Sequence, residues 1–232
     1  MEMRSQLEIE LYDVKVASRY LRVPAATLQW WLDGETRSGT TYEPVIREHA
    51  TGSKMLTWGE FVEAWYVRQY RREHKVELQH LRTFIGALRQ ETGHRYPLAH
   101  ETPLVAPGRR LVQRLQDSTG LPRDLWIVVA GNRGQLALTP TMTQFMERVE
   151  FDVTGEREAL LVRPRGQRSS IVIRPDQAFG APQVQGIRTE ALVELIDAGE
   201  DIHDVAQDFD LEPELLKEAL SYEWESRPLT TA

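Results

Sequence analysis

The side chains best suited to reading DNA bases fall in one short run, residues 25–30. The amide of Gln29 can pair with adenine in the major groove, and the methyl group of Thr27 can contact that of thymine. Small side chains beside them let a helix approach the bases closely. The predicted base-facing residues are therefore Ala25, Ala26, Thr27, Gln29 and Trp30.

Side chains that can reach DNA phosphates follow in residues 35–54, which are rich in Gly, Thr and Ser. Residues 41–46 have short β character and are flanked by turn residues, which predicts a small β-wing. Arg37, Arg47 and Lys54 lie in this segment and could reach phosphates. We expect Arg37 and Arg47, together with Tyr42, to contact DNA. The alternative interpretation is a plain solvated loop.

Residue types that carry catalysis or bind metals are not arranged for either task. The chain has no cysteine and six histidines, and no histidine pair shows the spacing of a zinc site. Asp201, Asp204, Asp208 and Asp210 could hold a divalent ion, but helix caps and a solvated face explain them better. No serine lies in a nucleophile elbow. The sequence therefore predicts no enzyme, no catalytic residue, no metal site and no cofactor.

Negative charge gathers at the C-terminal end of the chain. The whole sequence carries a net charge of −7, and residues 185–232 alone contain 13 acidic and 3 basic side chains, or −10. A phosphate backbone would be repelled there, so we expect this end to bind protein. The apolar anchors available beside the acidic helices are Tyr222, Trp224 and Leu229.

A helix-turn-helix must position the base-facing residues. Residues 14–21 have apolar side chains at helical spacing, and residues 22–24 form the turn. The second helix runs from about residue 25 to residue 32, with Leu28 and Trp31 facing inward. Pro24 suits the start of this helix and Gly34 its end.

A longer helix follows, and its start carries a capping box, Thr57-Trp58-Gly59-Glu60. Its broad apolar, largely aromatic face should pack against the helix-turn-helix. The next helix, about residues 77–91, repeats apolar residues at near-heptad spacing, which can pack internally or pair with a second copy of the chain. Because two copies on a palindromic site double the DNA contacts, we expect a homodimer. The candidate interface is Leu78, Leu81, Ile85 and Leu88.

These features divide the chain into three parts and predict an α+β fold that is mainly α. Residues 1–98 form the DNA-binding part, residues 99–182 a small mixed module with hairpins, and residues 183–232 an acidic three-helix module with a short tail. No apolar run is long enough to span a membrane, and the N-terminus lacks the apolar core of a signal peptide. We therefore expect a cytoplasmic protein.

Two stretches resemble known families. The text VASRYLRVPAATLQWWLDG, the wing around Tyr42 and the helix after LTWGEF make residues 11–98 similar to the winged helix-turn-helix of the MerR-like group. That family usually has Arg where Gln29 stands, so this chain departs from the family's phosphate clamp. Residues 182–224 resemble the domain DUF433, with the opening Gly186-Ile187-Arg188 and a following helix-turn-helix pair.

Together, the two stretches resemble a VapB-type antitoxin of the DUF433 class. This resemblance implies a PIN-like ribonuclease toxin as partner and an operon that the protein represses by binding operator DNA. Tyr222, Trp224, Arg227 and Leu229 would then contact the toxin, with Arg227 pairing with carboxylates that otherwise hold the ribonuclease's metal. The alternative is a MerR-like transcriptional regulator that senses a small molecule through the middle module. A nucleic-acid hydrolase is a third and weaker reading.

Overall fold

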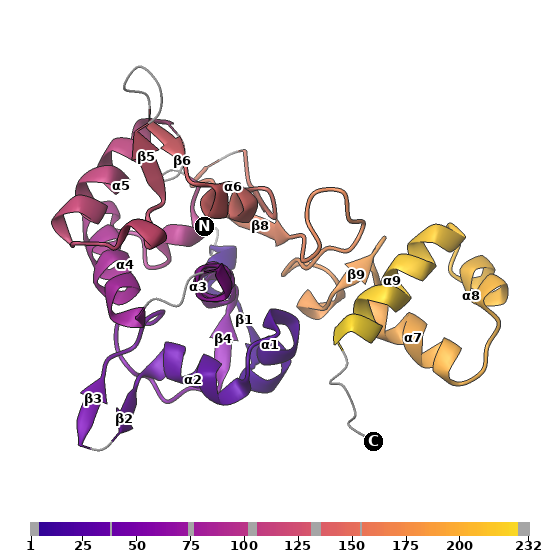
Figure 1. Ribbon diagram of the computed structural model, residues 1–232. Coiled ribbons are helices and arrows are strands. Elements are labelled where there is room, and N and C mark those ends of the chain that lie inside the picture. The colour runs from indigo at the N-terminus through magenta and orange to yellow at the C-terminus, as the bar shows by residue number, and fades with distance from the viewer. Residues whose placement is uncertain are drawn as a thin grey trace. The chain divides into compact units, whose positions relative to one another are not determined.

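The computed structural model describes residues 5–37, 39–73, 77–101, 106–130, 136–153 and 155–226. The chain divides into two compact units, residues 1–160 and 161–232. The sequence boundary at residues 98 and 99 lies inside the first unit, and the one at residues 182 and 183 lies inside the second. The fold mixes helices with small two-stranded sheets (Figure 1).

The first unit begins with a helix pair held between two short strands. After η1 (Gln6–Glu8), β1 (Glu10–Asp13) pairs antiparallel with β4 (Met55–Thr57). The helices α1 (Val14–Leu21) and α2 (Ala25–Asp33) contact each other and are joined by a three-residue turn. Asp13 caps α1 by accepting from the Val16 amide at 2.8 Å, and Pro24 is the N-cap of α2. The expected inward residues, Leu28 and Trp31, are buried.

A β-hairpin follows α2, formed by β2 (Glu35–Arg37) and β3 (Thr40–Tyr42). Gly34 ends α2 as expected, with its amide donating to the Trp30 carbonyl at 2.9 Å and a φ of 73°. A Cβ at this position would lie 2.1 Å from the Tyr42 carbonyl oxygen, so glycine lets the hairpin return against the end of the helix. The predicted wing is therefore a hairpin that starts earlier, at residue 35, and ends at residue 42.

The helix α3 (Trp58–Glu73) forms the centre of this unit (Figure 1). The expected capping box is present, because the Thr57 amide donates to Glu60 Oε2 at 3.0 Å and the Glu60 amide donates to Thr57 Oγ1 at 3.2 Å. The helix contacts α1, α2, η1, η2 (Pro97–Ala99) and α6 (Pro140–Met146). Its predicted apolar face is buried, namely Trp58, Phe61, Val62, Trp65 and Tyr66.

The helix α4 (Leu78–Thr92) corrects one prediction. The apolar stripe proposed as a dimer interface is covered by the protein's own chain, and its exposures are 6% for Leu78, 1% for Leu81, 0% for Ile85 and 0% for Leu88. The helix packs on α5 (Ala106–Ser118) and η2. A near-heptad repeat over fifteen residues fits an internal face as well as it fits a coiled coil, and here the internal face forms.

The rest of the first unit is a mixed α/β region. It contains η3 (Arg123–Leu125), the hairpin of β5 (Val128–Ala130) with β6 (Leu136–Leu138), and α6 (Pro140–Met146). It closes with β7 (Val149–Phe151), which pairs with β8 (Ala159–Val162), the strand in which the boundary between the units falls.

The second unit packs three helices around an apolar core. It comprises η5 (Ala178–Gly180), the hairpin of β9 (Gln183–Val184) with β10 (Ile187–Arg188), and the helices α7 (Thr189–Asp197), α8 (Ile202–Asp208) and α9 (Pro213–Ser226). Core residues from all three helices include Leu192, Val205 and Leu216. Across the described part of the chain, no helix combines the length and apolarity that a membrane crossing requires.

Candidate nucleic-acid interface and protein-binding surface

The exposed side of α2 carries most of the predicted base-facing residues. Ala26 is exposed, and Ala25, Thr27, Gln29 and Trp30 are half-buried. A shallow depression of about 570 Å³ opens beside the start of this helix. It is lined by Asp13, Val14, Lys15, Ala25, Ala26, Gln29 and Lys54. Two alanines and two lysines therefore border this depression at the N-terminal end of α2. Such a surface is suited to contact the phosphates along the edge of a DNA groove.

The amide group of Gln29 is engaged within the protein. Its Nε2 donates to Asp33 Oδ2 at 2.5 Å, and its Oε1 accepts from Lys54 Nζ at 3.0 Å. These contacts fix the orientation of the side chain on the helix surface. To read a base, Gln29 must exchange at least one of them for a hydrogen bond to DNA.

The hairpin presents Arg37 and Tyr42 to solvent, and both side chains are exposed. Trp30 packs edge-to-face on Tyr42, with ring centroids 6.4 Å apart at 85°. The Trp30 indole nitrogen is buried. Trp30 thus packs α2 against the hairpin. The sequence predicted only that Trp30 faces the bases and did not predict this packing role.

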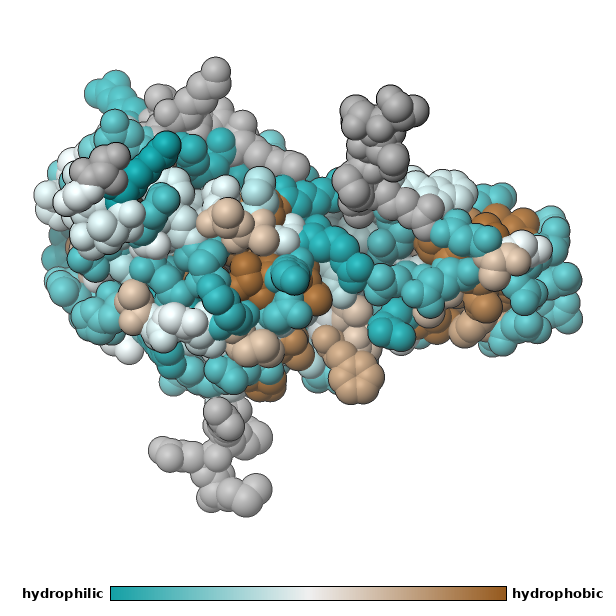
Figure 2. Space-filling view, turned by 90° about the horizontal axis from the view of Figure 1, so that it is seen from below, coloured by the Kyte–Doolittle hydropathy of each residue, from teal (hydrophilic) through white to brown (hydrophobic). Residues whose placement is uncertain are grey.

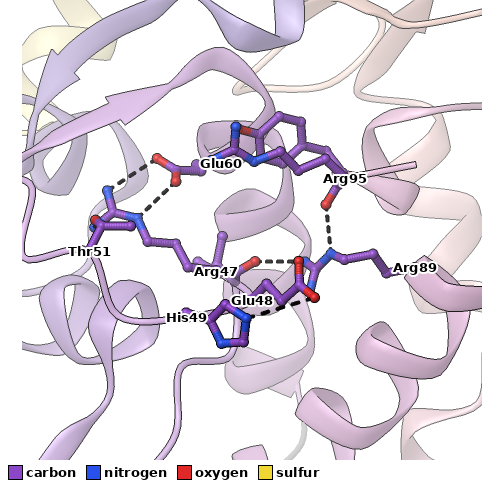
Figure 3. A pocket seen from close by; sticks show the side chains of 9 residues that line it. Arg47, Glu48, His49, Thr51, Glu60, Arg89 and Arg95 are labelled. Atoms are coloured by element: carbon purple, nitrogen blue, oxygen red, sulfur yellow. Dashed lines mark hydrogen bonds and ion pairs between the residues drawn. The ribbon is translucent and has the colours of Figure 1, made fainter. Parts of the chain in front are cut away.

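Arg47 requires a correction, because it is a core residue and does not face DNA. Its side chain is only 4% exposed, and its guanidinium pairs with Glu60 at 2.8 Å and with Asp33 at 2.7 Å. It also donates to Thr51 Oγ1 at 2.7 Å, a residue beside it in Figure 3, and to the Met55 carbonyl at 2.7 Å. Arg47 therefore ties the end of α2 and the 47–55 loop to the start of α3, and it is not available for the DNA contact that the sequence predicted.

The electrostatics of this cluster agree with its geometry. Burial lowers the pKa of Arg47, but the hydrogen bonds and charges of Glu60 and Asp33 outweigh burial and raise it. Burial raises the pKa of Asp33, and the Thr51 amide, Arg47 and the Gly52 amide together bring it below its usual value. Both partners are thus held in their charged forms at neutral pH.

A cavity of about 210 Å³ adjoins this cluster and is bordered by Arg47, Arg89 and Arg95 (Figure 3). Arg89 donates to the carbonyls of Ile46 and Arg95, each at 2.8 Å, and lies 3.6 Å from the Glu63 carboxylate. Glu63 is fully buried, and burial, opposed by Arg89 and the Leu98 amide, raises its pKa to about 7. The arginines here are directed toward acceptors of the protein itself, so the cavity is a structural junction.

The acidic surface of the second unit is concentrated in residues 194–214, which contain no lysine or arginine. This stretch covers the end of α7, all of α8 and the beginning of α9. The exposed carboxylates in it are Glu194, Asp197, Glu200, Asp201, Asp204, Asp208, Asp210, Glu212 and Glu214. Asp201 also caps α8, accepting from the His203 amide at 2.7 Å.

Other acidic residues of α9 serve the unit's own structure. Glu218 accepts from Ser169 Oγ at 2.6 Å and from the Ser170 amide at 3.2 Å. Glu225 pairs with Arg165, and Glu223 accepts from Thr189 Oγ1 at 2.5 Å. The net charge of the segment therefore overstates the charge that a partner would meet on α9.

The predicted protein-binding anchors separate in the structure. Trp224 is 50% exposed, but Tyr222 is 2% exposed and belongs to the core of the second unit, so its assignment to the partner surface is wrong. Helical spacing explains the difference, since residues two apart point to different sides of a helix. Arg227 and Leu229 lie outside the described residues.

One exposed aromatic residue was missed by the sequence analysis. Phe179 is 89% exposed, in a stretch where Ala178, Phe179 and Gly180 have φ values of 49°, 54° and 71°. Positive φ in two consecutive non-glycine residues is strained backbone, and nothing in the sequence indicates it.

On the face drawn in Figure 2 the surface is mainly hydrophilic, with apolar side chains in small separate patches.

A histidine pair was also missed. His94 and His100 stack with ring centroids 3.8 Å apart, beside Glu156. Burial is the main influence that lowers the pKa of His100, and the neighbouring His94 acts in the same direction against the Glu156 carbonyl and nearby carboxylates. His100 and Glu156 are 56 residues apart in the sequence, so no rule based on residue spacing could have predicted that they lie together.

Comparison with known proteins places this architecture among mycobacterial relatives. Residues 171–222 match the family DUF433, described as "Protein of unknown function". The chain is 28% identical over 226 residues to "Uncharacterized protein Rv2308" of Mycobacterium tuberculosis, covering 96% of this chain and 93% of that protein. It is 27% identical over 234 residues to "Putative antitoxin VapB45" of the same organism, covering 94% of this chain and 96% of that protein.

A solved structure shares the fold over almost the whole chain. The crystal structure of Rv2018 from Mycobacterium tuberculosis superimposes with a TM-score of 0.73 at 25% identity, covering 93% of this chain and all of that one. The match to the protein named "Putative antitoxin VapB45" covers 94% of this chain. The similarity therefore extends to both units.

Proposed function

We propose that this protein is the antitoxin of a type II toxin–antitoxin pair. It binds and inhibits a PIN-like ribonuclease toxin, and it represses its own operon by binding operator DNA. The observation that carries this proposal is the similarity to a protein named "Putative antitoxin VapB45", which covers 94% of this chain. The two tasks fit different units, because the first presents basic side chains on a helix pair and the second presents the acidic surface.

DNA binding is assigned to α1, α2 and the β2–β3 hairpin, which we interpret as a MerR-like winged helix-turn-helix. In such a unit the second helix enters the major groove. Ala25, Ala26 and Thr27 keep the start of α2 slender, Gln29 offers an amide, and Arg37 extends from the hairpin. Lys15 and Lys54, at the rim of the depression, replace Arg47 as phosphate-binding candidates.

Operator binding is tested by fluorescence anisotropy with the promoter DNA of the operon. Arg37→Ala should weaken binding to all sequences and reduce the salt slope by about 1, because one phosphate contact is lost. Thr27→Ala and Gln29→Ala should each lose about 1–3 kcal/mol on the operator alone. Arg174→Ala is the matched control, since Arg174 pairs with Asp176 in the second unit. Unchanged operator affinity in all three folded variants would exclude this surface.

Toxin binding is assigned to the acidic surface of residues 194–214 with exposed aromatic residues. A ribonuclease must hold a polyanion, so its substrate groove is basic, and an acidic partner is drawn to it electrostatically. Charge alone gives a salt-sensitive complex, and apolar anchors supply most of the affinity. Trp224 and Phe179 are the exposed aromatic candidates among the described residues of the second unit, and Arg227 and Leu229 stay predictions.

Inhibition is tested with the PIN-like ribonuclease of the proposed pair. The triple variant Asp204→Asn, Asp208→Asn, Asp210→Asn should slow association with the toxin, most strongly at low salt. The control is Glu91→Gln, Asp117→Asn, Glu147→Gln, which removes three exposed acidic groups from the first unit. If the two triple variants bind and inhibit alike, the acidic surface is not the toxin-binding site.

We also propose that the protein acts on DNA as a homodimer, since one short recognition helix covers too few base pairs for specificity. Because the α4 stripe is buried, the interface must use another surface. Light scattering on the protein with and without operator DNA measures this directly. A monomer under both conditions would refute the dimer.

A further inference from the structure

We propose that His94, His100 and Glu156 form a site for a divalent transition-metal ion, with zinc as the best fit. One ring nitrogen from each histidine and one carboxylate oxygen of Glu156 all lie within 4.8 Å of one another. Two imidazoles and a carboxylate are a ligand set that zinc uses in proteins. None of the three residues belongs to the surfaces assigned to DNA and toxin.

The three residues come from two segments that the fold brings together. His94 follows Gly93, the αL residue that ends α4, and His100 follows η2. Glu156 lies in the turn before β8, between Gly155 with a φ of 60° and Arg157 with a φ of 55°. The segments are already joined by the Glu101 amide, which donates to the Arg157 carbonyl at 3.0 Å, and by a bridge between His100 and Glu158.

The orientation of His100 favours coordination. Its Nδ1 lies 3.2 Å from the Glu156 carbonyl oxygen. A carbonyl can only accept, so Nδ1 carries the proton and the lone pair is on Nε2. Metal-binding histidines commonly hold their second nitrogen in this way, with a backbone carbonyl fixing the tautomer.

Binding an ion requires His94 to rotate out of the stack, because an imidazole binds a metal in the plane of its ring and two nearly parallel rings cannot point their lone pairs at one ion. Ligand atoms about 2.1 Å from a tetrahedral zinc ion lie about 3.4 Å from one another. His94 Nδ1 and Glu156 Oε2 are 4.0 Å apart, and the stacked rings are inclined by 18°. The Glu156 side chain is 71% exposed and that of His94 is 24% exposed, so both can rotate toward an ion while the buried His100 stays in place.

An ion held here would clamp the end of α4 to the turn that leads into β8. It would also place a positive charge between two neutral imidazoles and the carboxylates of Glu156 and Glu158, which act on His100 electrostatically. Zinc should therefore stabilise the first unit without a change in fold. Binding energy that is available only in the folded state appears directly as stability.

The test measures zinc binding to the full chain after treatment with a chelator. Calorimetry should show one saturable zinc ion per chain, and thermal unfolding should shift upward with zinc. His94→Ala and Glu156→Gln should each weaken affinity at least about tenfold, the usual effect of losing part of a metal site. His203→Ala is the control, since His203 is exposed in the second unit.

Resonances of the His94 and His100 rings followed by NMR during the titration locate the ion independently of stability. They should shift together, and those of His203 should not. If no saturable binding is seen up to about 0.1 mM zinc, the dissociation constant lies above that concentration and the proposal is overturned. Wild-type affinity in both folded variants would overturn it as well.

Discussion

Replacing Arg47 with methionine separates a structural role from a DNA-binding role. Methionine keeps an apolar stem of similar length but removes the guanidinium that bridges Asp33 and Glu60. Glu60 is then left as a charged group with a side chain that is only 4% exposed. Removing one partner of a buried ion pair destabilises a protein by about 3–5 kcal/mol, mainly because the other charge stays buried.

The structure places the expected value near the middle of this range. Asp33 is 13% exposed and keeps the Thr51 amide at 2.9 Å, so its charge remains partly compensated. Glu60 keeps only the Thr57 amide, at 3.0 Å, among the contacts described here. We therefore expect a loss of about 4 kcal/mol, which lowers the unfolding temperature of a chain of this size by roughly 8–16 °C.

Urea unfolding followed by tryptophan fluorescence measures the loss, and a double-mutant cycle identifies its cause. Glu60→Gln in the Arg47→Met background removes the stranded charge and should recover part of the stability. Operator affinity of the folded Arg47→Met protein should stay close to the wild-type value. A stability loss below about 1 kcal/mol together with weakened DNA binding would refute the buried-hub assignment and restore Arg47 to the interface.

Four further changes test other parts of the structure. The folded-state pKa of Glu63 is raised from 4.5 to about 7, so the free energy of unfolding should fall by up to about 3 kcal/mol as pH rises from 4.5 through 7. Glu63→Gln should remove this part of the pH dependence in unfolding measurements, and an unchanged profile would contradict the assignment. Gly34→Ala should lower the free energy of unfolding, measured by urea titration, by more than about 1 kcal/mol, because Gly34 has a φ of 73° and a Cβ there would lie 2.1 Å from the Tyr42 carbonyl oxygen. Wild-type stability would show that the hairpin shifts freely. Gly59→Ala should also destabilise, since its Cβ would lie 2.3 Å from the buried Tyr96 ring, and a thermal melt matching wild type would disprove the close contact. Phe179→Ser and Trp224→Ser should each change the free energy of unfolding by less than about 0.5 kcal/mol, yet weaken toxin binding by about 2 kcal/mol or more in calorimetry. Wild-type toxin affinity in both variants would remove these side chains from the proposed interface.

Local signals in the sequence predicted local structure well. The inward positions of Leu28 and Trp31, the stop at Gly34 and the Thr57–Glu60 capping box are all confirmed. Each depends on residues within one or two helical turns, where spacing alone decides which groups meet. A mixed module with hairpins was also expected in residues 99–182, but the helix α5 within it was not predicted.

Assignments that depended on distant partners were less accurate. Arg47 looked like a free cation because its partners Asp33 and Glu60 lie 14 and 13 residues away, and the sequence does not show that the loop folds back on them. The α4 stripe has the same spacing whether its cover is a second copy or the same chain. His100 and Glu156 are 56 residues apart, so only the fold reveals their proximity.

The carboxylate of Asp33 connects the proposed DNA-facing surface to the interior. Its Oδ2 accepts from Gln29, while its Oδ1 accepts from Arg47 and from the Thr51 amide. A base that draws the Gln29 amide away leaves Oδ2 without that donor, and the balance of charge around Arg47 changes with it. The orientation of Gln29 is therefore set by the same group that holds α2 to α3, so the proposed base recognition is physically coupled to the stability of this joint. Sequence reasoning treated Gln29 and Arg47 as two independent DNA contacts, whereas the structure makes one a surface group and the other its buried support.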